Sequence, residues 1–111
     1  MATFTAYDPN HQPIANFDYG IVSLINAVLN REDYDGKPMY LEPKELPALK
    51  SLLDRVNIGF NTSEIVKPST EHSWYHWSYQ IQPGESHFRV PLSTIMTHLS
   101  SKNVTLTILE D

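Results

Sequence analysis

The hydrophobic periodicity of the chain changes along its length, and this change constrains the fold more than any other feature. Between residues 21 and 56 the apolar residues recur at the spacing of amphipathic helices. From Ser73 onward they alternate with polar residues, which is the pattern of strands. Strands grouped in the second half, joined partly by a hairpin, favour α+β over a doubly wound fold. We therefore expect a mostly antiparallel sheet of about four to five strands, packed by two to three helices.

Two helices are predicted in the first half of the chain. In the first, Asn16 or Asp18 caps the start and Asn30 ends the helix. The second runs from about Leu46 to Val56, and prolines confine its start. The apolar stripe of the first helix consists of Ile21, Val22, Leu24, Ile25, Val28 and Leu29. The remaining elements of this half are a strand over 3–7, a turn at 8–10, a polar loop over 31–38 and short strands within 58–67.

A β-hairpin is predicted over residues 74–90. Pairing Trp77 with Val90 places Tyr79 opposite Phe88, so apolar side chains meet across the strands. Pro83-Gly84 supplies the turn. The face assigned to the core consists of Tyr75, Trp77, Tyr79 and Ile81. A short third helix beginning at Ser93 or Thr94 and a last strand over 103–111 complete the predicted order.

Length and composition predict one globular α+β domain over residues 1–111. The chain has no cysteine, which excludes disulfides and cysteine-ligated metal sites. Its four glycines form no phosphate-binding pattern. His72 and His76 are four apart, but on a strand they lie too far apart to share a metal. We therefore expect no cofactor and no metal. Without an export signal or a membrane-length apolar run, a cytoplasmic location is expected.

The net charge restricts the class of partner. Thirteen carboxylates outnumber eight lysines and arginines, which gives a formal charge of −5. Nucleic-acid binding requires cations that displace phosphate counterions, and an anionic membrane surface has the same requirement. We expect neither partner. A basic protein partner is compatible with this charge, because complementary charge speeds encounter.

Two groups of residues are candidates for partner binding. The first is the acidic stretch Glu32, Asp33, Tyr34 and Asp35 in the loop after the first helix, where carboxylates surround a tyrosine. Such a cluster suits pairing with lysine or arginine, although a solvated loop has the same composition. The second consists of Trp74 and His76, which fall on the strand face opposite the assigned core.

Three hypotheses for function follow. The leading one is a small acidic inhibitor of a basic protein, such as an immunity protein, an antitoxin or a phage-borne inhibitor of a nucleic-acid enzyme. The second is a small hydrolase or lyase with His76 or His87 as general base, since histidine transfers protons near neutral pH. The third is an assembly subunit whose homodimer interface buries Trp74.

Overall fold

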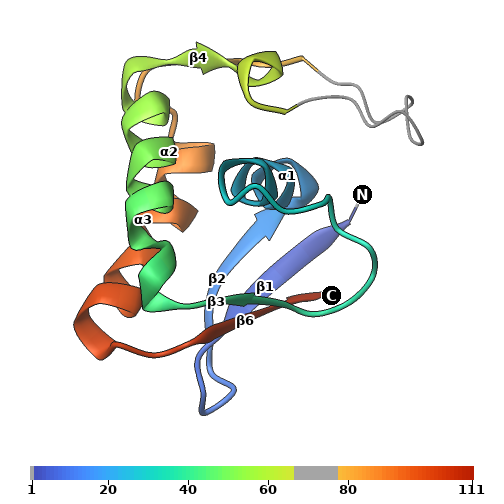
Figure 1. The fold of residues 1–111 in the computed structure, drawn as a ribbon, viewed down its shortest axis with the longest axis vertical. Coiled ribbons are helices and arrows are strands. Elements are labelled where there is room, and N and C mark those ends of the chain that lie inside the picture. The colour runs from blue at the N-terminus through green and yellow to red at the C-terminus, as the bar shows by residue number, and fades with distance from the viewer. Residues whose placement is uncertain (1, 67–77) are drawn as a thin grey trace.

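An antiparallel sheet of four strands organises the fold (Figure 1). The computed structural model describes residues 2–66 and 78–111. The strand order is β2-β1-β6-β3, so strands from opposite ends of the chain pair at the centre of the sheet. The strand bounds are β1 Thr3–Tyr7, β2 Pro13–Asp18, β3 Met39–Leu41 and β6 Leu106–Glu110. The α+β class predicted from the sequence is confirmed.

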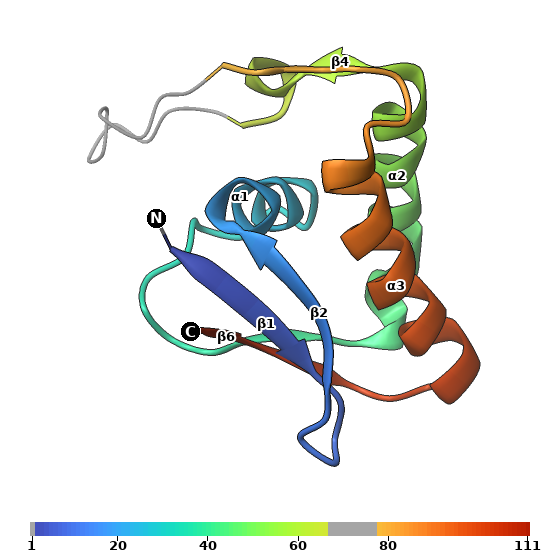
Figure 2. The same cartoon turned by 180° about the vertical axis from the view of Figure 1, so that it is seen from behind.

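Helices pack on the side of the sheet that carries the core (Figures 1 and 2). Helix α1 lies over the sheet, while α2 and α3 run side by side next to it. Beyond the end of α2, β4 pairs with β5 in a second, two-stranded sheet. The bounds are α1 Tyr19–Val28, α2 Leu46–Ile58, α3 Ser86–Lys102, β4 Phe60–Asn61 and β5 Gln80–Ile81, with 3-10 turns at Pro43–Glu45 and Thr62–Glu64.

The core lies between one face of the sheet and the helices. Successive side chains of a strand point to opposite faces, so burial alternates along each strand. In β6, Leu106 and Ile108 are fully buried while Thr107 is only partly so, as the sequence predicts for the last strand. The other large, fully buried side chains are Phe4, Ile21, Leu24, Ile25, Leu41, Leu49, Leu52, Ile81, Leu92, Ile95 and Leu99.

Helix α1 begins and ends where the sequence predicts, and α2 begins at Leu46 as predicted but continues two residues past Val56 to Ile58. Asp18 caps α1, because its carboxylate accepts a hydrogen bond of 3.2 Å from the backbone N–H of Ile21. Gly59 ends α2 with a φ of 83°, a conformation that favours glycine. The predicted turn after β1 also forms, since Asp8 accepts from the backbone N–H groups of Asn10 and Gln12. That turn leads into β2, a strand that the sequence did not predict.

The hairpin predicted over 74–90 is wrong. Residues 74–77 of its first strand lie outside the described residues, but Phe88 and Val90 of its second strand belong to helix α3. Ile81 pairs with Phe60 of β4 instead. The alternation over a few residues was outweighed by a helical stripe at residues 88, 92, 95 and 99, all of which are buried. The third helix therefore starts earlier than predicted, and Pro91 lies inside it rather than ending a strand.

Tyr79 also departs from its predicted role in the core. Its side chain is 45% exposed, and its ring contacts the edge of the core at Phe88 with centroids 5.8 Å apart. The hydroxyl donates to Glu85 at 3.0 Å. Of the predicted core face, Ile81 is buried as expected, whereas Tyr75 and Trp77 lie outside the described residues.

Candidate functional site

The acidic loop, residues 31–38, begins where α1 ends in a Schellman motif. Asn30 adopts the left-handed conformation with a φ of 58°. Its backbone N–H donates to Ala27, and the N–H of Arg31 donates to the carbonyl of Asn26 at 2.8 Å. This reversal turns the chain back along α1. It brings the start of the loop next to the side chain of Asn26.

Asp33 attaches the acidic loop to α1. Its carboxylate accepts from the hydroxyl of Tyr19 at 2.7 Å, from the hydroxyl of Ser23 at 3.1 Å and from the backbone N–H of Tyr34 at 2.9 Å. Tyr19, Ser23 and Asn26 are spaced four and three residues apart, so they share one face of the helix. The loop therefore packs on a polar stripe of α1. The hydrogen bonds of the Asp33 carboxylate are made within the molecule.

Tyr34 covers the end of the core under this loop. Its ring meets that of Phe4 edge to face, with centroids 4.9 Å apart. Burial raises the pKa of the Tyr34 hydroxyl above 10.0. A hydrogen bond with Glu110 and the negative charges of Glu110 and Asp35 raise this pKa further. The carboxylate of Glu110, at the end of β6, therefore lies near the Tyr34 hydroxyl of the acidic loop.

The carboxylates that remain available to a partner are those of Glu32 and Asp35. Asp35 uses one oxygen to accept from the backbone N–H of Lys37 at 3.1 Å. Glu32 is exposed and pairs with none of the residues that the structure describes. Both carboxylates are thus displayed by a loop that hydrogen bonds hold in place. Such preorganisation lowers the conformational entropy lost on binding.

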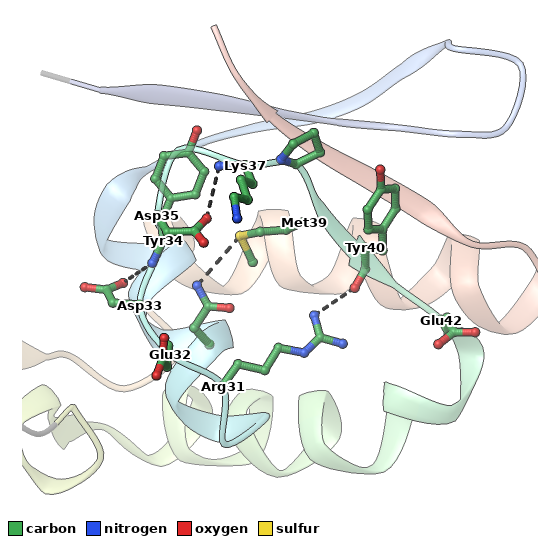
Figure 3. A pocket seen from close by; sticks show the side chains of 11 residues that line it. Arg31, Glu32, Asp33, Tyr34, Asp35, Lys37, Met39, Tyr40 and Glu42 are labelled. Atoms are coloured by element: carbon green, nitrogen blue, oxygen red, sulfur yellow. Dashed lines mark hydrogen bonds between the residues drawn. The ribbon is translucent and has the colours of Figure 1, made fainter.

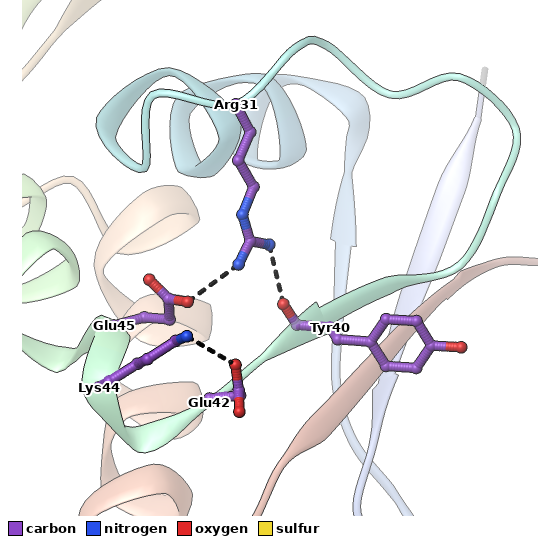
Figure 4. Close-up of polar contacts among 5 residues, drawn as sticks. All are labelled: Arg31, Tyr40, Glu42, Lys44 and Glu45. Carbon is purple, nitrogen blue, oxygen red and sulfur yellow. Dashed lines mark hydrogen bonds and ion pairs between the residues drawn. The ribbon is translucent and has the colours of Figure 1, made fainter.

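Arg31 connects the start of the loop with β3 and with the 3-10 turn that follows it (Figure 4). Its guanidinium donates to the backbone carbonyl of Tyr40 at 2.8 Å and to the carboxylate of Glu45 at 3.0 Å. Lys44 and Glu42 form a further ion pair of 3.3 Å beside it. The charge of Arg31 is therefore already balanced within the molecule.

The loop, α1 and β3 enclose an open hollow of about 280 Å³, named here the loop hollow (Figure 3). Four carboxylates line it, against two cationic side chains, so its charge is negative. Cations are therefore attracted to it and anions are repelled. The lining residues are Asn26, Arg31, Glu32, Asp33, Tyr34, Asp35, Lys37, Pro38, Met39, Tyr40 and Glu42.

The structure brings together four of the predicted site residues. Glu32, Asp33, Tyr34 and Asp35 all line the loop hollow. Trp74 and His76 lie outside the described residues. Sequence reasoning missed Asn26, although the spacing of Tyr19, Ser23 and Asn26 along one helix face was a usable signal. It also missed Glu110, which no local pattern connects with the loop.

His87, a candidate general base, lies away from the loop hollow. Its Nε2 is 2.7 Å from a carboxylate oxygen of Asp18, and its side chain is 53% exposed. The other oxygen of Asp18 caps α1, so this pair links the starts of α1 and α3. An exposed pair with such an anchoring role is typical of a surface contact between elements.

Two other classes of site are absent from the described part of the chain. Residues 2–66 and 78–111 contain no group of three or more histidine, cysteine or carboxylate side chains placed to hold a metal. Within the same residues, no helix has the length and hydropathy of a membrane span.

The chain matches no family model, no curated protein and no solved structure.

Proposed function

We propose that this chain binds a basic protein through the acidic loop. One observation carries the proposal: the exposed carboxylates of Glu32 and Asp35 stand on a loop that Asp33 fixes to α1, around a negatively charged hollow. The formal charge of −5 for the whole chain also favours a basic partner. Long-range attraction speeds the encounter with a basic partner, and the fixed carboxylates select its orientation.

The function that follows is inhibition of a target that handles nucleic acid. Lysine and arginine side chains that bind phosphate are the natural partners of carboxylates. A chain that places carboxylates on such cations competes with the phosphates of the substrate. An immunity protein, an antitoxin and a phage-borne inhibitor are the classes to which an inhibitor of this kind would belong.

The experiment is capture of the partner with the tagged chain from its native host, followed by mass spectrometry. Glu32→Lys is compared with Asp54→Lys, because both raise the net charge by two and both residues are exposed. We expect a basic protein to be recovered in stoichiometric amount by the wild type and by Asp54→Lys, but at least about tenfold less by Glu32→Lys.

Three results would contradict the proposal. Equal recovery by Glu32→Lys and Asp54→Lys would show that Glu32 contributes no more to binding than a surface carboxylate elsewhere. Recovery of an acidic protein would contradict the charge argument. Recovery of the chain itself alone, with both variants unaffected, would favour the homodimer hypothesis.

A second experiment tests inhibition. Addition of the chain to the recovered partner should inhibit the partner's binding to nucleic acid, measured by fluorescence anisotropy.

A further inference from the structure

Asn26 presents a buried amide beside the loop hollow with only a weak hydrogen bond within the described residues. The residue is only 3% exposed. Its amide nitrogen donates to the sulfur of Met39 at 3.7 Å, and a thioether is a weak acceptor. Its side-chain oxygen accepts no hydrogen bond from any residue that the structure describes. Buried amides ordinarily have strong partners, so this group requires an explanation.

The oxygen of this amide keeps contact with solvent. Among the described residues, every side-chain oxygen or nitrogen that is fully shielded from solvent has a hydrogen-bond partner. The Asn26 oxygen has none, so it must retain some contact with solvent. Asn26 lines the loop hollow and also a second hollow of about 300 Å³ between α1 and Val66. An acceptor held on a rigid helix therefore faces a cavity that solvent can enter.

The groups around this acceptor favour a cationic occupant. Glu32 lines the same hollow and has no ion-pair partner within the described chain. Arg31, which also lines it, is occupied by the carbonyl of Tyr40 and by Glu45. An incoming cation thus meets an amide oxygen and a free carboxylate, both of which accept hydrogen bonds.

The hollow is large enough to hold one side chain. Its volume of about 280 Å³ is just under the range of roughly 300 to 1,000 Å³ that is usual for small-molecule sites. Its rim residues Glu32, Asp35 and Lys37 are exposed, so the hollow is accessible from the surface that the acidic loop forms. A side chain projecting from a protein partner can enter it from that side.

We propose that the loop hollow receives a basic side chain of the protein partner, with the Asn26 oxygen and the Glu32 carboxylate as its acceptors. This inference rests on the proposed function and specifies what the acidic loop recognises. A guanidinium and an ammonium both donate hydrogen bonds to such acceptors, and a guanidinium can donate to both at once. The partner's arginine or lysine anchors the complex here, while Asp35 steers its approach.

The test is an NMR titration of the full-length, ¹⁵N-labelled chain with N-acetyl-arginine amide. N-acetyl-lysine amide compares the two cations, and N-acetyl-citrulline amide serves as an uncharged control of nearly the same shape. We expect saturable shifts of the Asn26 side-chain amide and of the backbone amides of 31–42 with one or both cationic probes. Citrulline should give none of these shifts. Equal shifts with citrulline, or no shifts with either cation, would overturn the inference.

Two variants test whether the Asn26 oxygen and the Glu32 carboxylate are the acceptors. Asn26→Leu and Glu32→Gln should each weaken binding of the cationic probe by about tenfold or more, because each removes an acceptor for a charged donor. Asp54→Asn is the matched control for Glu32→Gln and should leave binding unchanged. Asn26→Leu should also raise the thermal unfolding midpoint, since it replaces a poorly satisfied buried amide by an apolar group of similar size. If Asn26→Leu fails to fold, the exposed Glu32 decides the question alone, and unchanged binding by Glu32→Gln refutes the assignment.

The same variants separate this inference from the proposed function. If Asn26→Leu captures the basic partner as well as the wild type does, the partner binds the loop without using the hollow, and the inference fails alone. If the cationic probes bind but no basic protein is captured, the proposed function fails while the hollow remains a cation site.

Discussion

At the residue scale, Asp33 fixes the acidic loop from within. It connects the loop with two hydroxyl groups of α1, Tyr19 and Ser23, which lie fourteen and ten residues earlier in the chain. Asp33→Ala removes the acceptor of three hydrogen bonds. We expect it to lower the free energy of unfolding by about 1 to 2 kcal/mol, since such bonds contribute about this much each but are partly replaced by water here.

Glu32→Ala is the control for Asp33→Ala, and urea denaturation measures both. Glu32 is adjacent in sequence and makes no hydrogen bond or ion pair with the described residues, so its removal should change stability by no more than about 0.5 kcal/mol. Equal effects of the two variants would mean that Asp33 does not hold the loop.

Tyr34 makes stability depend on pH in the alkaline range. Burial and Glu110 raise its pKa above 10.0 in the folded state. Well below pH 10 the phenol is neutral in both states, so its contribution is constant. Above pH 10 the unfolded chain ionises first, and the free energy of unfolding falls as the pH rises toward the folded pKa. Tyr34→Phe should therefore lose stability less steeply than the wild type over this range.

Chemical denaturation of the wild type and Tyr34→Phe from neutral pH to above 10 measures this difference. Tyr79, whose pKa is raised chiefly by its hydrogen bond to Glu85, gives the wild type and the variant a common background slope. Parallel curves for the two chains would show that the environment of Tyr34 does not favour the neutral phenol.

At the scale of elements, the end of α1 sets the direction of the acidic loop. Asn30 occupies the left-handed region, which glycine adopts readily and β-branched residues avoid. Asn30→Gly should be neutral or stabilising, and Asn30→Val should be destabilising by about 1 to 2 kcal/mol.

Asn57→Val, on the exposed side of α2, is the control. It should have little effect because asparagine and valine have similar helix propensities. Thermal unfolding of the three variants tests this, and equal stability of Asn30→Val and Asn57→Val would contradict it.

The elements also show what the sequence could and could not predict. The stripes of α1 and α2 extend over several turns, so their helical period is unambiguous, and the alternation in β6 is equally clear. The alternation from Ser86 to Val90 covers five residues only, and the longer helical stripe of α3 determines their structure instead. Short segments follow their tertiary context more than their own pattern.

The candidate site was predicted in part for a related reason. Carboxylates gathered in a loop are visible in the sequence, and Glu32, Asp33, Tyr34 and Asp35 do lie together. Which of them point inward depends on partners distant in the chain, such as Ser23 for Asp33. Composition does not contain that information. The same holds for Asn26, whose role follows from the cavity beside it.

At the scale of the whole molecule, the proposed binding surface is confined to one end of α1 and the loop that follows. Helix α3 and the pair His87–Asp18 belong to other parts of the surface. A partner bound through the acidic loop should therefore leave α3 accessible. This separates the proposal from the alternatives that assign the partner to Trp74 and His76 or catalysis to His87.

Hydrogen–deuterium exchange of the chain, free and in complex with the captured basic protein, tests the central claim most directly. The backbone N–H groups of Arg31, Tyr34 and Lys37 form defined hydrogen bonds in the loop and report on it. We expect exchange within 31–42 to slow by at least about tenfold on binding, with α3 unchanged. Unchanged exchange in 31–42, with protection appearing in 67–77 or along α3, would contradict the claim that the acidic loop is the binding surface.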